Sequence, residues 1–423
     1  MSEETTAEAR PDAEAGQGAE KDVRAEKGAG AEKDVRAEKG AGAEKAAPAK
    51  PHTPPRVRQW VTLRSGSMDL RAGTGILSDL AQTLKSAVGR PHGCALVYEA
   101  GATADAALET LRRSISDKGF DLRIAELPAS TCDLAAVAAT DELLAELKIT
   151  ADDVVVAVGG YEALSVASFA CSTWCGGVSL AEVPLDPAAA VAAATTPRAL
   201  DLPGLPRMVE REGTARFSTI DTELFDIDGA AEPRRRAFTL MVHTAVCESD
   251  KACGGLWDAA DELASGSESA LVAQLQDSVK SRGKVVASTS AAVRQSMELG
   301  RSFAHALMRV AGSDVAASTA LGDGLRFASR LGVALESLAV DDMFAVDELL
   351  ERLGVGETGV AVDERALLEA LVDERFRRTN RLMLALPRSL GRVRLAAVAQ
   401  ETLAEHVGAW CASRPAADVA GRA

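Results

Sequence analysis

Aromatic residues, paired cysteines and long apolar runs are all scarce in this sequence. Phe, Trp and Tyr make up 4% of its 423 residues, so a core must be built mainly from Ala, Val and Leu. The seven cysteines are odd in number and irregularly spaced, which argues against a disulfide framework and against a zinc site, and favours a cytoplasmic location. No apolar run approaches the roughly 18 residues of a membrane span, and the first residues lack a signal-peptide core, so we expect no membrane association.

Positive charge is also in short supply. Lys and Arg number 47 against 62 Asp and Glu, which gives a formal charge of −15. Such an excess leaves no broad basic surface, and we therefore expect no nucleic-acid partner. The apolar share of 47% and the charged share of 26% are ordinary for a globular protein, and the length suffices for two or three domains.

Large apolar residues are nearly absent from residues 1–56. Segment 19–30 (AEKDVRAEKGAG) recurs letter for letter at 31–42, and a cluster of prolines follows it. A segment of this composition cannot offset the entropy lost on ordering. We predict a disordered low-complexity tail over 1–56, and a docking role for it stays open.

Short apolar runs alternate with helical patterns from residue 57 to about residue 229. A hairpin over 59–72 is followed by strands at 94–98, 122–127, 153–158, 177–182 and 216–221. Helices are expected between them at 76–88, 102–118, 133–147 and 187–194. This alternation predicts parallel βαβ units, that is, an α/β domain over 57–229 of the Rossmann-like, nucleotide-binding type.

Strand 153–158 runs directly into Gly159 and Gly160. In an open α/β sheet the ligand lies where strand ends meet helix N-termini, so these glycines are candidates for cofactor binding. A plain strand-to-helix turn is the alternative. After Pro233 the strand signal stops, and we predict an all-α domain over 230–415. The cleft between the two domains is the expected place for a site.

A charged stripe marks residues 294–307, taken as one helix. Its members recur at spacings of 4, 3 and 4: Arg294, Glu298, Arg301 and His305. The stripe is either a solvated face laced with Glu–Arg pairs or the lining of the interdomain cleft. In the second case two arginines and a histidine could hold an anionic substrate. Spacing alone leaves both interpretations open.

Four local patterns, in order, resemble the dehydroquinate synthase family of sugar phosphate cyclases over roughly residues 60–400. The family's GGGxxGDxxGF turn, VPTTLLAQVDASVGGKT segment, LID strand end and K-x-x-VV…R…LNLGHTFGHA run are matched at 159–169, 183–198, 218–221 and 282–306. The resemblance implies a dehydroquinate synthase-like two-domain fold and a homodimer. It also implies chemistry that uses NAD and a zinc or cobalt ion.

The sequence departs from the family at the residues that hold these cofactors. The family's metal ligands correspond to Leu240, Arg301 and, by an ungapped count, Ala317, none of which can bind Zn²⁺. Tyr161 replaces the third glycine of the turn, and Ser165 replaces the Asp that follows. The comparison therefore implies that the family metal site is lost, and it leaves NAD open.

Several matched positions remain polar. Arg294 and His305 coincide with the family's own Arg and His, His243 stands where the family carries a substrate-handling Lys, and Arg198 replaces a Lys. Lys284 and Asp323 lie nearby in the alignment without a family role. The candidates are thus as follows: catalytic, His243, His305 and Glu298; substrate-binding, Arg198, Arg294, Arg301, Lys284 and Asp323; cofactor-binding, Gly159 and Gly160.

Three functions follow as hypotheses. The first is a divergent enzyme of specialised metabolism that acts on a small anionic substrate by metal-independent acid/base chemistry: elimination, enolisation, or aldol-type closure or condensation. The second is a non-catalytic pseudoenzyme or binding partner of the same fold, and the third an NAD-dependent sugar phosphate cyclase. An open cleft at the Arg/His stripe would favour the first, and a cleft filled by side chains such as Tyr161 and Leu240 the second.

Overall fold

The computed structural model describes residues 55–88, 92–128, 131–203, 205–225, 231–376 and 382–415, without the side chains of 205, 206, 375 and 376. The predicted tail lies outside these ranges except for its last two residues. Residues Thr53–Ala423 form one compact unit, which holds every element described below.

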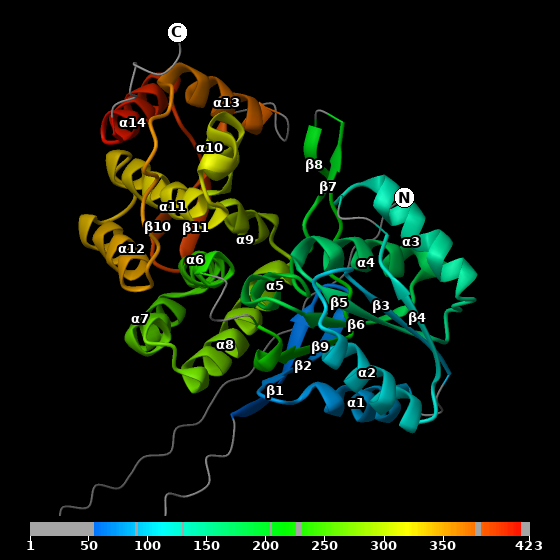
Figure 1. Cartoon of the computed structure of the whole chain (residues 1–423). Coiled ribbons are helices and arrows are strands. Elements are labelled where there is room, and N and C mark those ends of the chain that lie inside the picture. The colour runs from blue at the N-terminus through cyan, green and yellow to red at the C-terminus, as the bar shows by residue number, and fades with distance from the viewer. Residues whose placement is uncertain are drawn as a thin grey trace, which may run out of the picture. The chain divides into compact units, whose positions relative to one another are not determined.

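A seven-stranded sheet forms the N-terminal part of this unit (Figure 1). Its strands follow one another across the sheet as β1 (Arg56–Leu63), β2 (Gly66–Gly73), β9 (Phe217–Asp221), β6 (Ser179–Pro184), β5 (Val154–Gly159), β3 (Gly93–Tyr98) and β4 (Asp121–Glu126). β1 and β2 pair antiparallel, and all other neighbours pair parallel. The predicted hairpin and the five predicted strands are confirmed.

Helices cover both faces of the sheet because both faces are apolar. One face carries α1 (Leu80–Val88) and α2 (Asp105–Asp117), and the other carries α3 (Leu134–Glu146), α4 (Tyr161–Thr173) and α5 (Pro187–Ala192). In β5, Val156 packs on the first face and Val155 on the second. Strands buried on both sides read as continuous apolar runs, which is why β3 and β5 were recognisable in the sequence.

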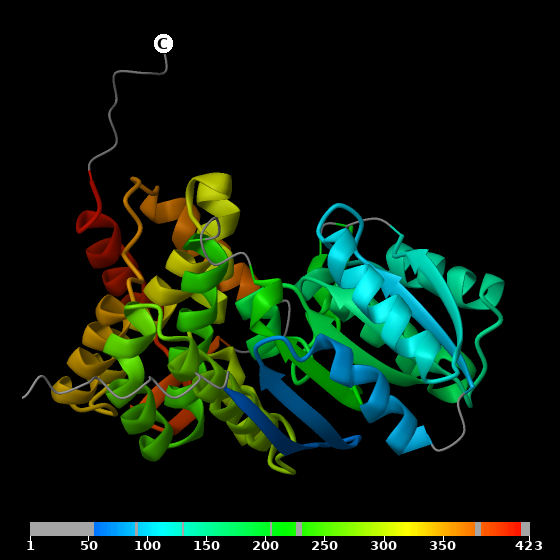
Figure 2. The same ribbon diagram turned by 60° about the horizontal axis from the view of Figure 1, so that its bottom comes forward.

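The C-terminal part is helical, as predicted, with one exception. Its helices are α6 (Ala231–Glu248), α7 (Asp250–Ala264), α8 (Glu268–Val286), α9 (Ala291–Arg294), α10 (Arg301–Ala311), α11 (Ala317–Ala334), α12 (Val340–Arg352), α13 (Glu364–Phe376) and α14 (Gln400–Ala412). The exception is a hairpin of β10 (Met383–Ser389) and β11 (Arg392–Ala397), which lies within the range 230–415 predicted to be all helical. Gly391, at φ +76°, makes its turn. Helix α8 packs on β1 at the edge of the large sheet (Figure 2).

The prediction of one helix over 294–307 is wrong. Helix α9 ends at Arg294, a 3-10 turn (η4, Gln295–Glu298) follows, and the chain bends at Gly300 before α10 begins at Arg301. Gly300 has φ +70°, and a Cβ added to it would stand 2.8 Å from the backbone of Gly324 in α11. The backbones of Gly300 and Gly324 lie so close that no side chain fits between them. Glycine has no side chain and readily adopts the positive φ of the bend, so it suits this position.

A second hairpin, which the sequence analysis did not predict, follows α5. It consists of β7 (Leu200–Leu202) and β8 (Leu205–Val209), which are too short for an alternating pattern to be visible. Within β8, Arg207 has φ +58°, a left-handed conformation that is uncommon for a residue other than glycine. None of the described helices is both long and apolar enough to cross a membrane.

Candidate functional site

A cleft of about 850 Å³ opens between the sheet part and the helical part of the compact unit. The β7–β8 hairpin and the loop after α5 form one wall, while α9, η4 and the start of α10 form the other. Five arginines line it: Arg64, Arg207, Arg211, Arg294 and Arg301. A volume of this size is typical of small-molecule sites, and with Glu210, Glu212 and Glu298 also in the lining its charge is on balance positive.

The bend at Gly300 brings three of the predicted residues to the same wall. Arg294, Glu298 and Arg301 all line the cleft. Arg294 donates to the carbonyl oxygens of Ser288 and Thr289 at 2.7 and 3.1 Å, which fixes its guanidinium. Among the described residues, the Arg301 guanidinium has no hydrogen-bond or ion-pair partner, so its donors are available to a ligand.

His243 supports this wall from behind instead of facing the cleft. It is fully buried on α6, and its Nε2 lies 3.1 Å from the carbonyl oxygen of Met297. Because a carbonyl can only accept, Nε2 carries the proton. One turn further, the Sγ of Cys247 donates to the carbonyl oxygen of Ser296 at 3.1 Å. Burial, Arg301 and Arg282 hold the pKa of His243 well below its usual value, so the ring is neutral.

His305 also lies outside the cleft lining. It contacts Arg207 of the sheet part and Glu374 of the helical part, and so links the two parts of the chain. The Nη1 of Arg207 contacts both ring nitrogens, Nδ1 at 3.2 Å, and the Oε2 of Glu374 lies 3.6 Å from Nδ1. Burial and the Arg207 charge lower the pKa of His305 to about 4. The ring is therefore neutral near pH 7, and both of its nitrogens are engaged.

Three further predicted residues lie away from the cleft. Arg198 binds the carboxylate of Asp201 at 2.6 Å. Lys284 binds Glu248 at 2.8 Å and lines a separate cavity of about 300 Å³ among α6, α7 and α8. Asp323 is fully buried in α11, where it accepts the backbone N–H of Thr358 at 2.9 Å. Each of these three side chains thus binds a residue outside the cleft lining.

Gly159 and Gly160 form the turn between β5 and α4, as the sequence indicated. The N–H of Gly160 donates to the Oε2 of Glu99 at 2.7 Å. A Cβ on Gly160 would stand 3.3 Å from this oxygen and 3.5 Å from the Oδ2 of Asp186. Two carboxylates therefore occupy the surroundings of a helix N-terminus where a pyrophosphate would otherwise bind. Tyr161 turns aside and donates its hydroxyl to the carbonyl oxygen of Thr196 at 2.7 Å.

The positions that match the family's metal ligands carry no suitable donor. Leu240 is a buried apolar residue of α6, Ala317 begins α11, and Arg301 lines the cleft. Within the described ranges, no three or more His, Cys, Asp and Glu side chains come together as a metal site would require.

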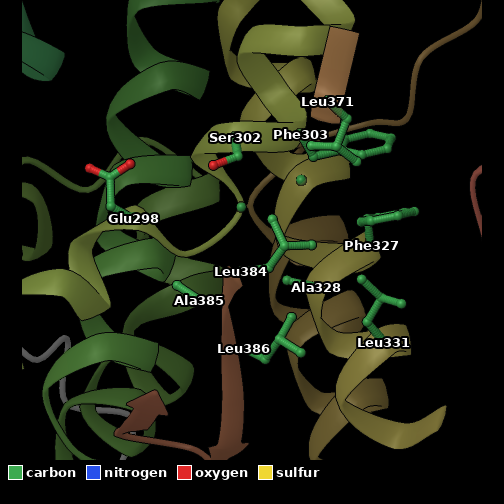
Figure 3. A pocket seen from close by; sticks show the side chains of 12 residues that line it. Glu298, Ser302, Phe303, Phe327, Ala328, Leu331, Leu371, Leu384, Ala385 and Leu386 are labelled. Carbon is green, nitrogen blue, oxygen red and sulfur yellow. The ribbon is translucent and has the colours of Figure 1, made fainter. Parts of the chain in front are cut away.

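A narrow crevice lies beside the cleft (Figure 3). Glu298 and Ser302 stand at its polar end, and Phe303, Phe327 and Leu384 form its apolar walls. Its volume of about 10 Å³ holds at most a single water molecule. Glu298 thus lies at the junction of this crevice and the larger cleft.

Sequence reasoning missed Arg207 and the two threonines of the cleft, Thr195 and Thr196. The threonines lie near the end of segment 183–198, which loosely matches the family's VPTTLLAQVDASVGGKT pattern, and this match was the available signal. Arg207 lies in a hairpin that gave no strand signal, and its charged surroundings, RMVEREG over 207–213, do not distinguish it from a surface loop.

Sequence comparison finds dehydroquinate synthases, although no protein-family model matches the chain. A 3-dehydroquinate synthase of Nocardia farcinica is 32% identical over 114 residues, 26% of this chain and 30% of that protein. The matched stretch of the chain thus spans less than a third of the length of this relative. A 3-dehydroquinate synthase of Mycolicibacterium gilvum is 25% identical over 316 residues, 73% of this chain and 85% of that protein.

Solved structures with the same fold include two cyclising synthases and, at lower TM-scores of 0.57 to 0.60, several alcohol dehydrogenases and reductases. A 2-deoxy-scyllo-inosose synthase complexed with carbaglucose-6-phosphate, NAD⁺ and Co²⁺ superposes with a TM-score of 0.72 at 15% identity, over 83% of this chain and 99% of the other. A 2-epi-5-epi-valiolone synthase of Streptomyces hygroscopicus, with NAD⁺ and Zn²⁺ bound, gives 0.69 at 14% identity, over 83% and 98%. The fold is therefore of the sugar phosphate cyclase class. In sequence and fold together, the chain resembles the dehydroquinate synthase-like sugar phosphate cyclases, which confirms the predicted resemblance.

Proposed function

We propose that this chain is a divergent dehydroquinate synthase-like enzyme that acts on a small anionic substrate by acid/base chemistry without a metal. One observation carries the proposal: the cleft of about 850 Å³ is open, and Arg294, Glu298 and Arg301 converge on one wall. Tyr161 and Leu240, which would fill a closed site, are not part of its lining. An open, charged cleft supports an enzyme over a pseudoenzyme of the same fold.

The side chains at the family's metal positions support metal independence. Leu240 and Ala317 have no donor atom, and the guanidinium of Arg301 is a fixed cation that binds anions instead of a metal. Arg301 can stabilise an oxyanion by charge and hydrogen bonds, but it cannot act as a Lewis acid. Similar solved structures contain Co²⁺ or Zn²⁺, and the donors present here do not fit these ions.

The turn at Gly160 supports the absence of a resident NAD. Its N–H already serves the carboxylate of Glu99, and Asp186 adds a second negative charge. A pyrophosphate there would have to displace one carboxylate and approach the other. An NAD-dependent cyclase remains the alternative, and native mass spectrometry of the purified protein separates the two: a retained dinucleotide would favour the alternative.

Glu298 is the proposed base because it lies in the cleft beside Arg301. Its carboxylate would take a proton from the carbon next to a substrate carbonyl, and the electron pair would move to the carbonyl oxygen, which Arg301 stabilises. The enolate then either expels a leaving group from the β-carbon or attacks a second carbonyl carbon. The proton held by Glu298 passes to the leaving group in the first case and to the new alkoxide oxygen in the second. His243 and His305 act as positioning residues in this scheme, because one is buried and the other joins Arg207 to Glu374.

The test is solvent deuterium exchange in the full chain, followed by NMR with a panel of phosphorylated sugars and keto acids. We expect one class to exchange its α-proton or to be converted, and Glu298→Gln to lower that rate by about 100-fold or more. The same substitution at Glu146, exposed at the end of α3, should leave the rate unchanged. A folded protein that exchanges and converts none of these compounds would support the pseudoenzyme instead.

We further propose that the protein is a homodimer, that it is located in the cytoplasm and that it acts in specialised metabolism. The dimer is supported by the family resemblance alone, and sedimentation velocity of the full chain tests it. The location is supported by the cysteines, none of which forms a disulfide. The specialised role is supported by the similar fold of the inosose and valiolone synthases.

A further inference from the structure

A second cavity, of about 300 Å³, lies among α6, α7 and α8, away from the cleft. Its floor is partly apolar, since Met241 of α6 and Leu256 of α7 both line it and are each 1% exposed. Among the described residues, none lines both this cavity and the cleft. A volume of this size lies at the lower end of the range for small-molecule sites, so the cavity can take one small ligand.

Helix α8 brings buried polar groups to this floor. Gln274 and Ser278, one turn apart, line the cavity and are 9% and 3% exposed. Within the described ranges their side chains make a single hydrogen bond, from the Gln274 Nε2 to the Ser278 Oγ at 3.3 Å. The Oε1 of Gln274 can therefore still accept a hydrogen bond, and the hydroxyl of Ser278 can still donate one. Polar groups at this depth normally have partners, and a polar ligand in the cavity would supply them.

Charges of both signs stand at the rim of the cavity. Asp277 and Lys280 lie one turn apart on α8, Lys251 lies on α7, and all three are exposed. None of the three has an ion-pair partner in the part of the chain that the structure describes, whereas Lys284 is already paired with Glu248 at 2.8 Å. A ligand with one positive and one negative group can pair with both signs. A simple anion or cation is repelled by one of them.

Arg282 connects this cavity to the cleft. Thr244 lines the cavity, and its hydroxyl accepts a hydrogen bond from the Nη1 of Arg282 at 2.8 Å. The Nη2 of Arg282 donates to the hydroxyl of Thr196, which lines the cleft, at 2.5 Å. The Arg282 side chain is fully buried. Because a packed interior transmits small displacements, a shift of Thr244 moves the guanidinium and, with it, Thr196.

We propose that this cavity is an effector site for a free α-amino acid with a polar side chain. The ammonium group pairs with Asp277 and the carboxylate with Lys280. The side chain of the ligand enters the cavity and exchanges hydrogen bonds with Gln274 and Ser278. Its presence is felt in the cleft through Arg282. Binding here goes beyond the proposed acid/base chemistry and does not depend on it, since none of the four contacting residues lines the cleft.

Calorimetric titration of the full chain tests the site, with L-glutamine as the probe. Glutaramate lacks the ammonium group of glutamine, and γ-aminobutyramide lacks its carboxylate. We expect glutamine to bind at least about tenfold more tightly than either analogue, and Lys280→Gln and Ser278→Ala each to weaken its binding about fivefold or more. Lys85→Gln, which removes an equal charge from the exposed side of α1, should change binding by less than about twofold.

Hydrogen exchange followed by mass spectrometry tests the link to the cleft. We expect saturating glutamine to change exchange in residues 193–198, which include Thr196, as well as in α8. Thr244→Val keeps the shape of the side chain and removes the hydroxyl that accepts from Arg282. This variant should still bind glutamine, and the change at 193–198 should be lost.

The inference is overturned if glutamine does not bind the folded protein saturably, if either analogue binds as tightly, or if Lys280→Gln and Lys85→Gln behave alike. Binding that is lost in Arg301→Gln and kept in Lys280→Gln would place glutamine in the cleft and contradict the site. Binding without any change at 193–198 would overturn the effector role. Should Ser278→Ala or Thr244→Val fold poorly, the exposed Lys280 and the wild-type exchange decide. None of these outcomes involves turnover, so they are distinct from a failure of the proposed chemistry.

Discussion

Glu182 is a buried carboxyl group without a hydrogen-bond partner among the described residues. It lies on the central strand β6, and it is 1% exposed. Burial raises the pKa of Glu182 to about 8. The residue is therefore a neutral acid at neutral pH, because a carboxylate at this depth would lack any compensating donor.

This raised pKa makes stability depend on pH in a predictable direction. The unfolded chain releases the Glu182 proton near pH 4.5, whereas the folded chain retains it up to about pH 8. Between these values the folded state binds more protons, so the free energy of unfolding falls as pH rises, by up to about 1.4 kcal/mol per pH unit. Urea unfolding between pH 5 and 8 should show a flatter profile for Glu182→Gln than for wild type; parallel profiles would contradict the assignment.

At the level of single residues, the sequence could indicate which side chains are charged but not which of them face the cleft. Arg294, Glu298 and Arg301 reach the cleft by way of a bend that their spacing did not reveal. Asp323 binds Thr358 and Lys284 binds Glu248, both outside the cleft. Residue spacing cannot identify a partner that is distant in sequence.

The element that shapes the site is the bend between η4 and α10. Gly300→Ala should destabilise the protein in two ways: its φ of +70° is strained for alanine, and the new Cβ would stand 2.8 Å from the backbone of Gly324 and Leu325. Strain alone costs about 1–2 kcal/mol. We expect a larger loss of unfolding free energy, measured by urea unfolding.

Gly354 provides the control. It has φ +71°, it follows the C-terminal end of α12, and a Cβ there would meet nothing within 4 Å. Gly354→Ala therefore carries the strain of a positive φ without the contact. Equal losses for the two variants would show that the close approach of Gly300 to Gly324 does not hold the bend.

Helices and strands could be predicted from the sequence where a helical pattern was long or where a strand was buried on both faces. β3, β5 and the helices between the strands follow from continuous apolar runs and helical periodicity. The β7–β8 hairpin has strands of three and five residues, and β10–β11 lies in a region whose apolar spacing also suits a helix. In both cases tertiary packing decided what local pattern could not.

For the whole chain, the order of four weak motifs predicted more than any single residue did. It indicated the two-part architecture that sequence relatives and solved structures share. It could not indicate how the two parts are joined, because the joining residues come from distant segments. Besides the packing of α8 on β1, one such connection is formed by Arg207 in the β7–β8 hairpin, His305 in α10 and Glu374 in α13.

Acid should weaken this connection. His305 binds a proton near pH 6.5 in the unfolded chain but only near pH 4 when folded, so its contribution to stability is complete above pH 6.5 and is lost as pH falls toward 4. His305→Asn should remove this part of the acid sensitivity and increase amide hydrogen exchange in β7–β8 and α10, followed by mass spectrometry. His406→Asn, on α14, is the control, because its Nδ1 contacts only a carbonyl within its own helix, that of Thr402 at 3.0 Å, among the described residues. If exchange increases equally in both variants, or in neither, then Arg207 and Glu374 hold the two parts together without His305.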